Sequence, residues 1–256
     1  MKSKSLAVAV MVFSVFFMLT GVAVSQTTPT ELCVLIDGSG SVSSSDFDLQ
    51  LQGLASAIND PTVVPQDGNV TVSVIQFSSG AQLEVPPTVI DSAATASSVA
   101  NTILAISQLN GGTSYVAGVT EALSSGFTFS TNRQIIDMST DGVPNNPNTS
   151  PLRTQAVGAG VDVINAIAVG GVSTQALQDL VYPQPASQPF DPGFIVEVNN
   201  FQEYVTAIQN KIRQEITPGP IGDAAEVPTI SEWGMILLSL FLAGTALWAI
   251  RKKTMA

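Results

Sequence analysis

Residues 31–59, ELCVLIDGSGSVSSSDFDLQLQGLASAIN, decide the fold of this chain. They begin with the apolar run Leu32–Ile36, which is typical of a strand that is buried on both faces. The tight loop Asp37–Ser41 follows, and Ser44–Asn59 then repeats its apolar residues at three- and four-residue steps, as a helix does. A buried strand, a polar glycine-bearing loop and an amphipathic helix in direct succession predict the first unit of an open α/β sheet.

The middle of the chain continues this alternation of short apolar runs and segments of helical period. We expect further strands at Val70–Phe77, Leu83–Ile90, Gln134–Met138, Asp162–Val169 and Phe194–Val198, and helices at Ala93–Leu109, Tyr115–Leu123, Leu152–Ala159, Thr174–Val181 and Phe201–Ile216. Leu83–Ile90 contains proline and is expected at a sheet edge, and Pro144–Pro151 is expected to be a loop. The order predicts an α/β fold with a doubly wound, mainly parallel central sheet flanked by helices. Ligands of such sheets bind beyond the carboxyl ends of the strands.

The N-terminus has the layout of a secretory signal peptide. Lys2 and Lys4 precede the uncharged apolar run Leu6–Val24, and small residues stand before a cleavage site between Ser25 and Gln26. We expect residues 1–25 to be removed and residues 26–30 to form a short lead. The apolar run is long for a signal peptide, so an uncleaved N-terminal anchor is the alternative.

A second hydrophobic segment lies near the C-terminus. Trp233–Ile250 is 18 residues long and uncharged, and the basic residues Arg251–Lys253 follow it directly. As a helix it would be about 27 Å long, close to the thickness of a hydrocarbon core. We expect the basic cluster to stay in the cytoplasm, which leaves the bulk of the chain outside the membrane.

Charge and composition exclude several classes of function. Residues 26–232 hold all 20 acidic residues but only four of the nine basic ones, a formal balance of −16 that should repel nucleic acid. The chain has no histidine, which excludes Ser–His and Cys–His catalysis and histidine-ligated zinc. The single cysteine, Cys33, lies in the first strand and is expected to be a buried, inert thiol.

Asp137, inside the strand Gln134–Met138, is expected to be a hydrogen-bonded core or edge residue rather than a catalytic one.

Oxygen-bearing side chains gather in three glycine-containing loops. Asp37-Gly38-Ser39-Gly40-Ser41 follows the first strand, Gly111-Gly112-Thr113-Ser114 joins two helices, and Ser139-Thr140-Asp141-Gly142 follows a later strand. Carboxylates and hydroxyls are hard ligands, which suit Mg²⁺, Mn²⁺ or Ca²⁺ better than zinc or copper. The alternative is structural: Ser39 and Ser41 would only cap a turn and the next helix.

These positions resemble the metal-ion-dependent adhesion site of von Willebrand factor A domains, which integrins also contain. Asp37-x-Ser39-x-Ser41, a distant Thr113 and a later Asp141 fill all five motif positions, within a match that covers roughly residues 31–216. The resemblance implies a Rossmann-like A-domain fold in which Ser39, Ser41 and Thr113 bind the ion through hydroxyls. It implies that Asp37 and Asp141 contribute charge directly or through water, and that one coordination position stays open for a partner's carboxylate. Residues 34–60 and 133–146 are especially similar to a bacterial branch of uncharacterised A-type domains.

The C-terminal tail resembles the I-P-T-L-x-x-W-G sorting signals of Gram-negative bacteria. After the linker Thr217–Glu226 the chain has VPTISEWG at residues 227–234, directly before the apolar span. The motif positions are Val227, Pro228, Thr229, Ile230, Trp233 and Gly234. The resemblance implies processing by an exosortase-type membrane protease. The alternative is an ordinary transmembrane anchor with Trp233 at the membrane interface.

The sequence therefore predicts one A-type domain (31–216), a linker (217–226) and a sorting and membrane tail (227–256). We expect a cation-dependent protein-binding or adhesion module, not an enzyme, at the cell envelope or surface or released from it. Its protein partner is expected to supply an acidic residue. One alternative is a structural or sensing component of envelope assembly, in which the metal mainly supports folding. A hydrolase is the weaker alternative, because no base is in place to activate a bound water.

Overall fold

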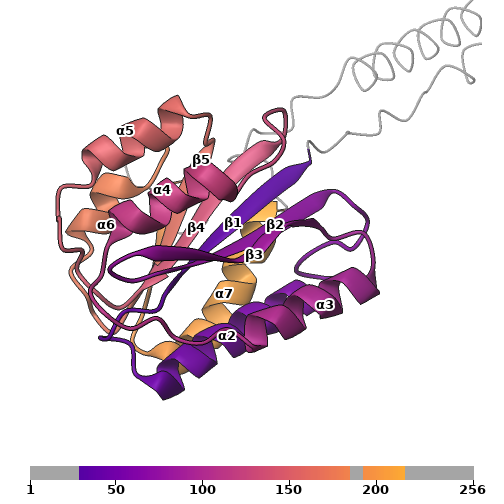
Figure 1. Ribbon diagram of the computed structural model, residues 1–256, viewed down its shortest axis with the longest axis horizontal. Coiled ribbons are helices and arrows are strands. Elements are labelled where there is room, and N and C mark those ends of the chain that lie inside the picture. Colours follow the sequence, from indigo (N-terminus) through magenta and orange to yellow (C-terminus); the bar gives the residue numbers. More distant parts are fainter. Residues whose placement is uncertain (1–28, 185–192, 217–256) are drawn as a thin grey trace, which may run out of the picture.

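The computed structural model describes residues 29–184 and 193–216, which form an α/β domain (Figure 1). Its strands are β1 (Thr30–Asp37), β2 (Val70–Phe77), β3 (Ala81–Val89), β4 (Arg133–Thr140), β5 (Val163–Val169) and β6 (Ile195–Val198). Its helices are α2 (Ser44–Asn59), α3 (Ala93–Leu104), α4 (Tyr115–Ser125), α5 (Ser150–Gly158), α6 (Gln175–Leu180) and α7 (Phe201–Ile216). The predicted signal peptide, linker and tail lie outside these residues. Within the described part of the chain, no helix is both long and apolar enough to cross a membrane.

The strands form one sheet in the order β3-β2-β1-β4-β5-β6. All neighbouring pairs are parallel except β2 with β3, whose pairing is antiparallel and places β3 at an edge. From β1 the chain winds outward through β2 and β3, then returns to β4 on the other side of β1. The predicted mainly parallel, doubly wound sheet is therefore confirmed, and its topological switch point lies between β1 and β4.

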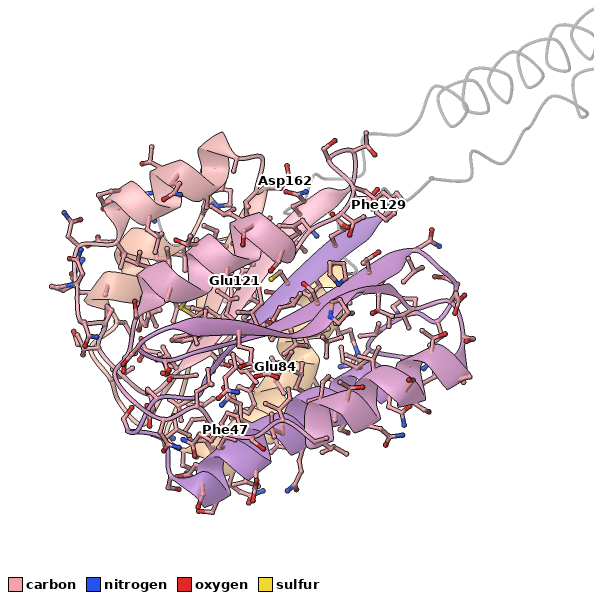
Figure 2. The ribbon with its side chains drawn as sticks, viewed as in Figure 1. Phe47, Glu84, Glu121, Phe129 and Asp162 are labelled. Atoms are coloured by element: carbon pink, nitrogen blue, oxygen red, sulfur yellow. The ribbon has the colours of Figure 1, made fainter. Side chains whose placement is uncertain are left out.

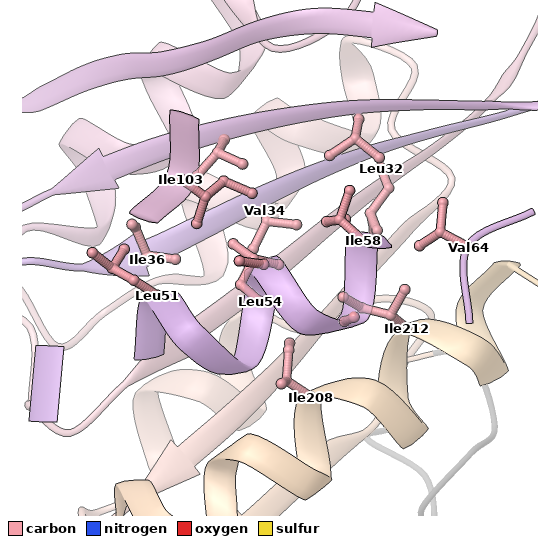
Figure 3. Packing of buried hydrophobic residues seen from close by; sticks show 14 of the residues in the cluster. Leu32, Val34, Ile36, Leu51, Leu54, Ile58, Val64, Ile103, Ile208 and Ile212 are labelled. Atoms are coloured by element: carbon pink, nitrogen blue, oxygen red, sulfur yellow. The ribbon is translucent and has the colours of Figure 1, made fainter. Parts of the chain in front are cut away.

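Helices cover both faces of the sheet and bury its central strands. All eight residues of β1 are buried, as the apolar run predicts. Helices α2, α3 and α7 pack on one face, and α4, α5 and α6 pack on the other (Figure 1). Figure 3 shows the first of these layers, in which side chains of β1 meet those of α2 and α7. The residues labelled from these elements are Leu32, Val34, Ile36, Leu51, Leu54, Ile58, Ile208 and Ile212.

Different residues lie at the amino and the carboxyl ends of the strands. Phe129 and Asp162 lie at the amino ends of the strands, near the places where the described chain begins and ends (Figure 2). Asp162 Oδ2 accepts a hydrogen bond from the backbone N–H of Gln134, at the start of β4. Phe47, in the first turns of α2, lies toward the opposite end. The loops that follow β1 and β4 open at that opposite, carboxyl end.

Most predicted boundaries differ from the observed ones by one or two residues, and the end of α3 differs by five. Strand β4 continues through Ser139 and Thr140, which were predicted in the loop after it. Helix α3 ends at Leu104 rather than at Leu109, because residues 105–114 form a loop that is bound to the ends of β1 and β2. Helix α5 begins at Ser150, so Pro151 lies in its first turn, where a missing N–H costs no helical hydrogen bond. Strand β3 begins at Ala81, two residues before the predicted start at Leu83.

Candidate metal site at the switch point

Asp37 forms the buried base of the candidate site. It is the last residue of β1 and its side chain is 0% exposed. Its two carboxylate oxygens are separately held: the N–H of Ser39 donates to Oδ1 at 2.8 Å, and Thr140 Oγ1 donates to Oδ2 at 2.6 Å. Burial raises the pKa of the Asp37 carboxyl, against these hydrogen bonds, and the nearby charge of Asp141 raises it further. A carboxylate in such a place is stabilised by a cation.

A chain of oxygen atoms leads from this base to the surface. Ser39 Oγ and Ser41 Oγ are 2.9 Å apart and share a hydrogen bond, and Ser41 Oγ donates to Asp141 Oδ1 at 2.7 Å. Ser39 is buried, Ser41 is exposed and Asp141 is half-buried, so the chain ends in contact with solvent. Partial burial also raises the pKa of the Asp141 carboxyl.

Thr113 joins the same cluster from the loop between α3 and α4. A Cβ added at Gly142 would lie 2.9 Å from Thr113 Oγ1 and 3.4 Å from Ser41 Oγ, so both hydroxyls lie against this glycine. The N–H of Asn145 donates to the carbonyl of Thr113 at 2.9 Å, which binds the two loops together. All five residues predicted from the motif therefore meet at the switch point.

The capping alternative for the serines does not hold for helix α2. Ser43, not Ser39 or Ser41, is its N-cap, and Ser43 Oγ accepts a hydrogen bond from the N–H of Asp46 at 3.2 Å. The hydroxyls of Ser39 and Ser41 are thus left to the cluster around Asp37 and Asp141.

Gln50 holds the backbone of Asp37 and was not predicted as part of the site. From α2, its Nε2 donates to the carbonyl of Asp37 at 3.0 Å, and its Oε1 accepts from the N–H of Asp37 at 3.2 Å. Ser139 Oγ donates to the same Oε1 at 2.8 Å. One indication of this role is present in the sequence, because a polar glutamine stands on the apolar face of α2 that also carries Phe47, Leu51 and Leu54.

Two further glutamines fix the loop at residues 105–114 over the site. Gln108 Nε2 donates to the carbonyl of Ser39 at 3.0 Å, and Gln76 Oε1 accepts from the N–H of Leu109 at 2.6 Å. A Cβ at Gly38 would lie 2.0 Å from Gln76 Oε1, so any larger residue here would displace the amide of Gln76 that holds Leu109. The backbone around the candidate ligands is therefore held from both sides.

Asp137 belongs to a separate buried cluster. It is 0% exposed, as expected of a core residue, but hydrogen bonding is the wrong prediction for its carboxylate. Among the described residues its oxygens accept no hydrogen bond, and Asp137 instead forms an ion pair with Lys211 of α7. Lys211 Nζ also contacts Glu215 Oε1 at 2.6 Å, and Asn165 Nδ2 donates to that oxygen at 2.7 Å. Burial raises the pKa of Glu215 to about 8, and the charge of Asp137 adds to the effect.

The donor set fits a hard divalent cation. In residues 29–184 and 193–216, no group of three or more His, Cys, Asp and Glu side chains could hold a metal. The candidate site instead combines two carboxylates with three hydroxyls, which are ligands that Mg²⁺, Mn²⁺ and Ca²⁺ accept. Cys33 is fully buried, as predicted, and burial raises the pKa of its thiol to about 12.

Comparison with protein families shows to which family the chain belongs. Residues 27–220 match a family described as a protein of unknown function, DUF1194. The chain belongs to the DUF1194 family. Residues 227–252 of this DUF1194 protein match the IPTL-CTERM motif, which confirms the predicted sorting-type tail. No curated protein matches it.

Solved structures show which fold this DUF1194 protein has. Proximal thread matrix protein 1 of the mussel byssus is 17% identical with a TM-score of 0.60, over 74% of this chain and 48% of that one. The pilus adhesin SpaC of Lactobacillus rhamnosus GG is 14% identical with a TM-score of 0.59, over 75% and 31%. BatB of Bacteroides thetaiotaomicron, a conserved hypothetical protein, is 16% identical with a TM-score of 0.56, over 74% and 100%.

These likenesses identify the fold as that of a von Willebrand factor A-type domain, as the sequence resemblance implies. The DUF1194 protein spans about half of the mussel protein's length and about a third of the length of SpaC. The mussel protein has also been solved with a zinc-occupied MIDAS motif, at 16% identity and a TM-score of 0.60 over 74% of this chain and 46% of that one.

Proposed function

We propose that this protein is an exported module that binds a partner protein through a divalent cation. The observation that carries the proposal is the hydrogen-bonded set Asp37, Ser39, Ser41 and Asp141 at the switch point, with Thr113 against it. The mussel protein with its zinc-occupied motif and the adhesin SpaC have the same fold, which supports a cation and a binding role.

The five residues would hold the ion, and the bound ion would supply a positive centre for a carboxylate of the partner. Hydroxyl ligands bring no charge, so Asp37 and Asp141 would be the only charged groups among the five ligands. Ser41 and Asp141 lie at the solvent end of the oxygen chain, where a partner can approach. We propose Mg²⁺ or Mn²⁺ as the resident ion, with Ca²⁺ as the alternative, because all candidate ligands are oxygen atoms.

We also propose that the domain is not an enzyme. A hydrolytic site needs a base within reach of the reacting water. The chain has no histidine, and Tyr115, whose pKa burial raises, uses its hydroxyl to donate to the carbonyl of Gly142 at 2.7 Å. The arrangement suits binding rather than proton transfer.

The predicted signal peptide and the IPTL-CTERM motif support a place at the cell surface. We propose that the mature chain begins near Gln26, and that its domain lies outside the inner membrane. The segment Trp233–Ile250 would anchor it there until an exosortase-type protease processes the tail. Protease added to spheroplasts should then degrade the domain; digestion only after the membrane is broken would contradict this topology.

Calorimetric titration with MgCl₂ and MnCl₂ tests the cation. The full chain is reconstituted in lipid nanodiscs and first freed of metal with a chelator. We expect binding at one site and its loss in Asp37→Ala, because this change removes the buried carboxylate at the base of the site. The matched control is Asp91→Ala, which removes an exposed carboxylate beside α3 and should bind as the wild type does. Equal affinity in Asp37→Ala and the wild type would contradict the proposal.

Chelation separates the proposed function from its alternative. Partner capture from an envelope extract should require Mg²⁺, while the circular dichroism spectrum should stay the same in chelator. A structural or sensing component whose metal supports folding should lose capture and fold together. Asp37→Ala should reproduce the effect of the chelator without any chelator present.

A further inference from the structure

Two exposed apolar side chains lie on the loops that carry the candidate metal ligands, and a third lies in the first turn of α4, which follows Thr113 and Ser114. Among residues 29–184 and 193–216, six large hydrophobic side chains are exposed, and three of them are close in sequence to Thr113 or Asp141. These three, which we call the apolar rim, are Leu109 (39% exposed), Val116 (46%) and Val143 (51%). Isolated exposed apolar residues are ordinary, but a group around one site marks an interaction surface.

Backbone hydrogen bonds hold the rim in place around the site. Asn110, next to Leu109, donates its N–H to the carbonyl of Gly38 at 2.8 Å, and Gly40 donates to the carbonyl of Gly111 at 2.9 Å. The loop of Val143 is bound to the carbonyl of Thr113 through the N–H of Asn145, also at 2.9 Å. The backbone of the loops that carry Leu109 and Val143 is thus bound to the loops of the candidate ligands, and the start of α4 is held by the hydrogen bond from the N–H of Ser114 to the carbonyl of Ser78 at 2.9 Å.

The surroundings of the rim are nearly free of charge. No charged residue occurs in residues 38–45, 92–120 or 142–152, which contain the loops of the site and the rim. The charged residues that border these segments are Asp37, Asp46, Asp91, Glu121, Asp141 and Arg153, of which Asp37 and Asp141 are candidate ligands. These segments thus bring no charged side chain of their own to a partner, so the bound cation would be the ionic contact that they present, with the apolar rim beside it.

We propose that the partner inserts a segment in which a single carboxylate is flanked by apolar side chains. This inference rests on the proposed function, because the carboxylate needs the cation. The flanking side chains would cover the apolar rim and remove its surface from water. A segment with several charges would find no counter-charges on the segments that carry the rim, and its charged groups would be desolvated there without a partner. The rim therefore selects among acidic segments that the metal alone would accept equally.

Two synthetic peptides of the same length test the proposal. One carries a glutamate between leucines and the other a glutamate between serines, and both are labelled for fluorescence anisotropy. With the full chain in lipid nanodiscs and saturating MgCl₂, the leucine peptide should bind at least tenfold more tightly. Val143→Ser and Leu109→Ser should each weaken the leucine peptide about fivefold, since each removes the contact of a half-exposed aliphatic side chain. Neither change should affect the serine peptide.

The chain provides controls matched in residue type and exposure. Val89→Ser changes a valine that is 39% exposed at the end of the edge strand β3, and Leu104→Ser changes a leucine that is 51% exposed at the end of α3. Both should bind the leucine peptide as the wild type does. Equal binding of the two peptides, binding of neither, or equal losses in rim and control variants would overturn the inference. Leucine-peptide binding that survives both chelator and Asp37→Ala would overturn the proposed function as well.

Discussion

Thr140, at the end of β4, donates a hydrogen bond of 2.6 Å to Oδ2 of Asp37, at the end of β1. Its Oγ1 also accepts from the N–H of Gly142 at 3.1 Å. A single buried hydroxyl thus connects the carboxylate at the base of the site to the loop that carries Asp141. It spans the switch point of the sheet, where the two halves of the fold meet. We therefore regard Thr140 as a residue that positions the candidate ligands.

Thr140→Val should weaken cation binding. Valine keeps the shape of threonine but leaves Asp37 Oδ2 and the N–H of Gly142 without this partner, at a cost of about 1–3 kcal/mol in the free energy of unfolding. A misplaced carboxylate should lower Mg²⁺ affinity by about tenfold, which corresponds to about 1.4 kcal/mol. Thr140→Ser should bind as the wild type does, and so should Thr154→Val on the exposed face of α5. Calorimetry that gives Thr140→Val wild-type affinity would show that Thr140 does not position Asp37.

The sequence was sufficient for the fold and for the candidate ligands because both depend on local patterns. Apolar runs and helical periods predict β1 and α2 directly, and the five ligand positions follow strands or begin helices. The hydrogen bonds that hold the candidate ligands in place could not be predicted from the sequence. Gln108 binds the carbonyl of Ser39, 69 positions away in the chain, and Thr140 binds Asp37 across 103. Such pairs become visible only when the order of the strands is known. The same reason explains the early end of α3, whose predicted last turn is a loop that binds Gln76.

The buried ion cluster had a weak local signal. Tyr204, Ile208, Lys211 and Glu215 follow one another at helical spacing, so the core-facing side of α7 contains a lysine and a glutamate within reach of each other. What the spacing cannot supply is the second carboxylate. Asp137 comes from β4, and only the packing of α7 on the sheet brings it to Lys211.

Lys211→Met should destabilise the domain by about 3–5 kcal/mol, the usual cost of breaking a buried ion pair from one side. The change leaves Asp137 and Glu215 as two carboxyls in the core without their shared cation. Adding Glu215→Gln to Lys211→Met should recover part of the loss. Arg213→Met, at a half-buried position of the same helix, should cost only about 1 kcal/mol, because it removes hydrogen bonds at the surface such as that from Arg213 Nε to the carbonyl of Thr62. Urea unfolding measures all four proteins; equal midpoints for Lys211→Met and Arg213→Met would contradict the role of the cluster.

Substitutions in the tail distinguish sorting from simple anchoring. A plain anchor needs only the apolar span and the basic residues after it, so changes at Pro228, Thr229 or Trp233 should have no effect on processing. A sorting signal is recognised as a sequence, and the same changes should retain an unprocessed precursor in the membrane. Because residues 227–252 match the IPTL-CTERM motif, we expect the second result. Intact-mass analysis decides: a wild-type mature chain that still contains residues 233–256 would contradict processing.

The stability of the domain should fall as the pH rises through the neutral range, and Glu215 should account for part of the fall. Burial raises its pKa from 4.5 to about 8, so the folded state holds this proton more tightly than the unfolded state. The resulting stabilisation is complete below pH 4.5 and is lost as the pH rises through about 8. The charge of Asp137 also raises the pKa of Glu215, and the charge of Lys211 lowers it. The guanidinium of Arg133 donates to the backbone carbonyl of Glu215 and not to its side chain. Urea unfolding between pH 5 and 8.5 should therefore show a flatter profile for Glu215→Gln than for the wild type. Glu203→Gln changes an exposed residue of the same helix, and its stability should depend on pH as that of the wild type does. If the stability of all three proteins changes with pH in the same way, Glu215 is ionised over this whole range and the prediction is wrong.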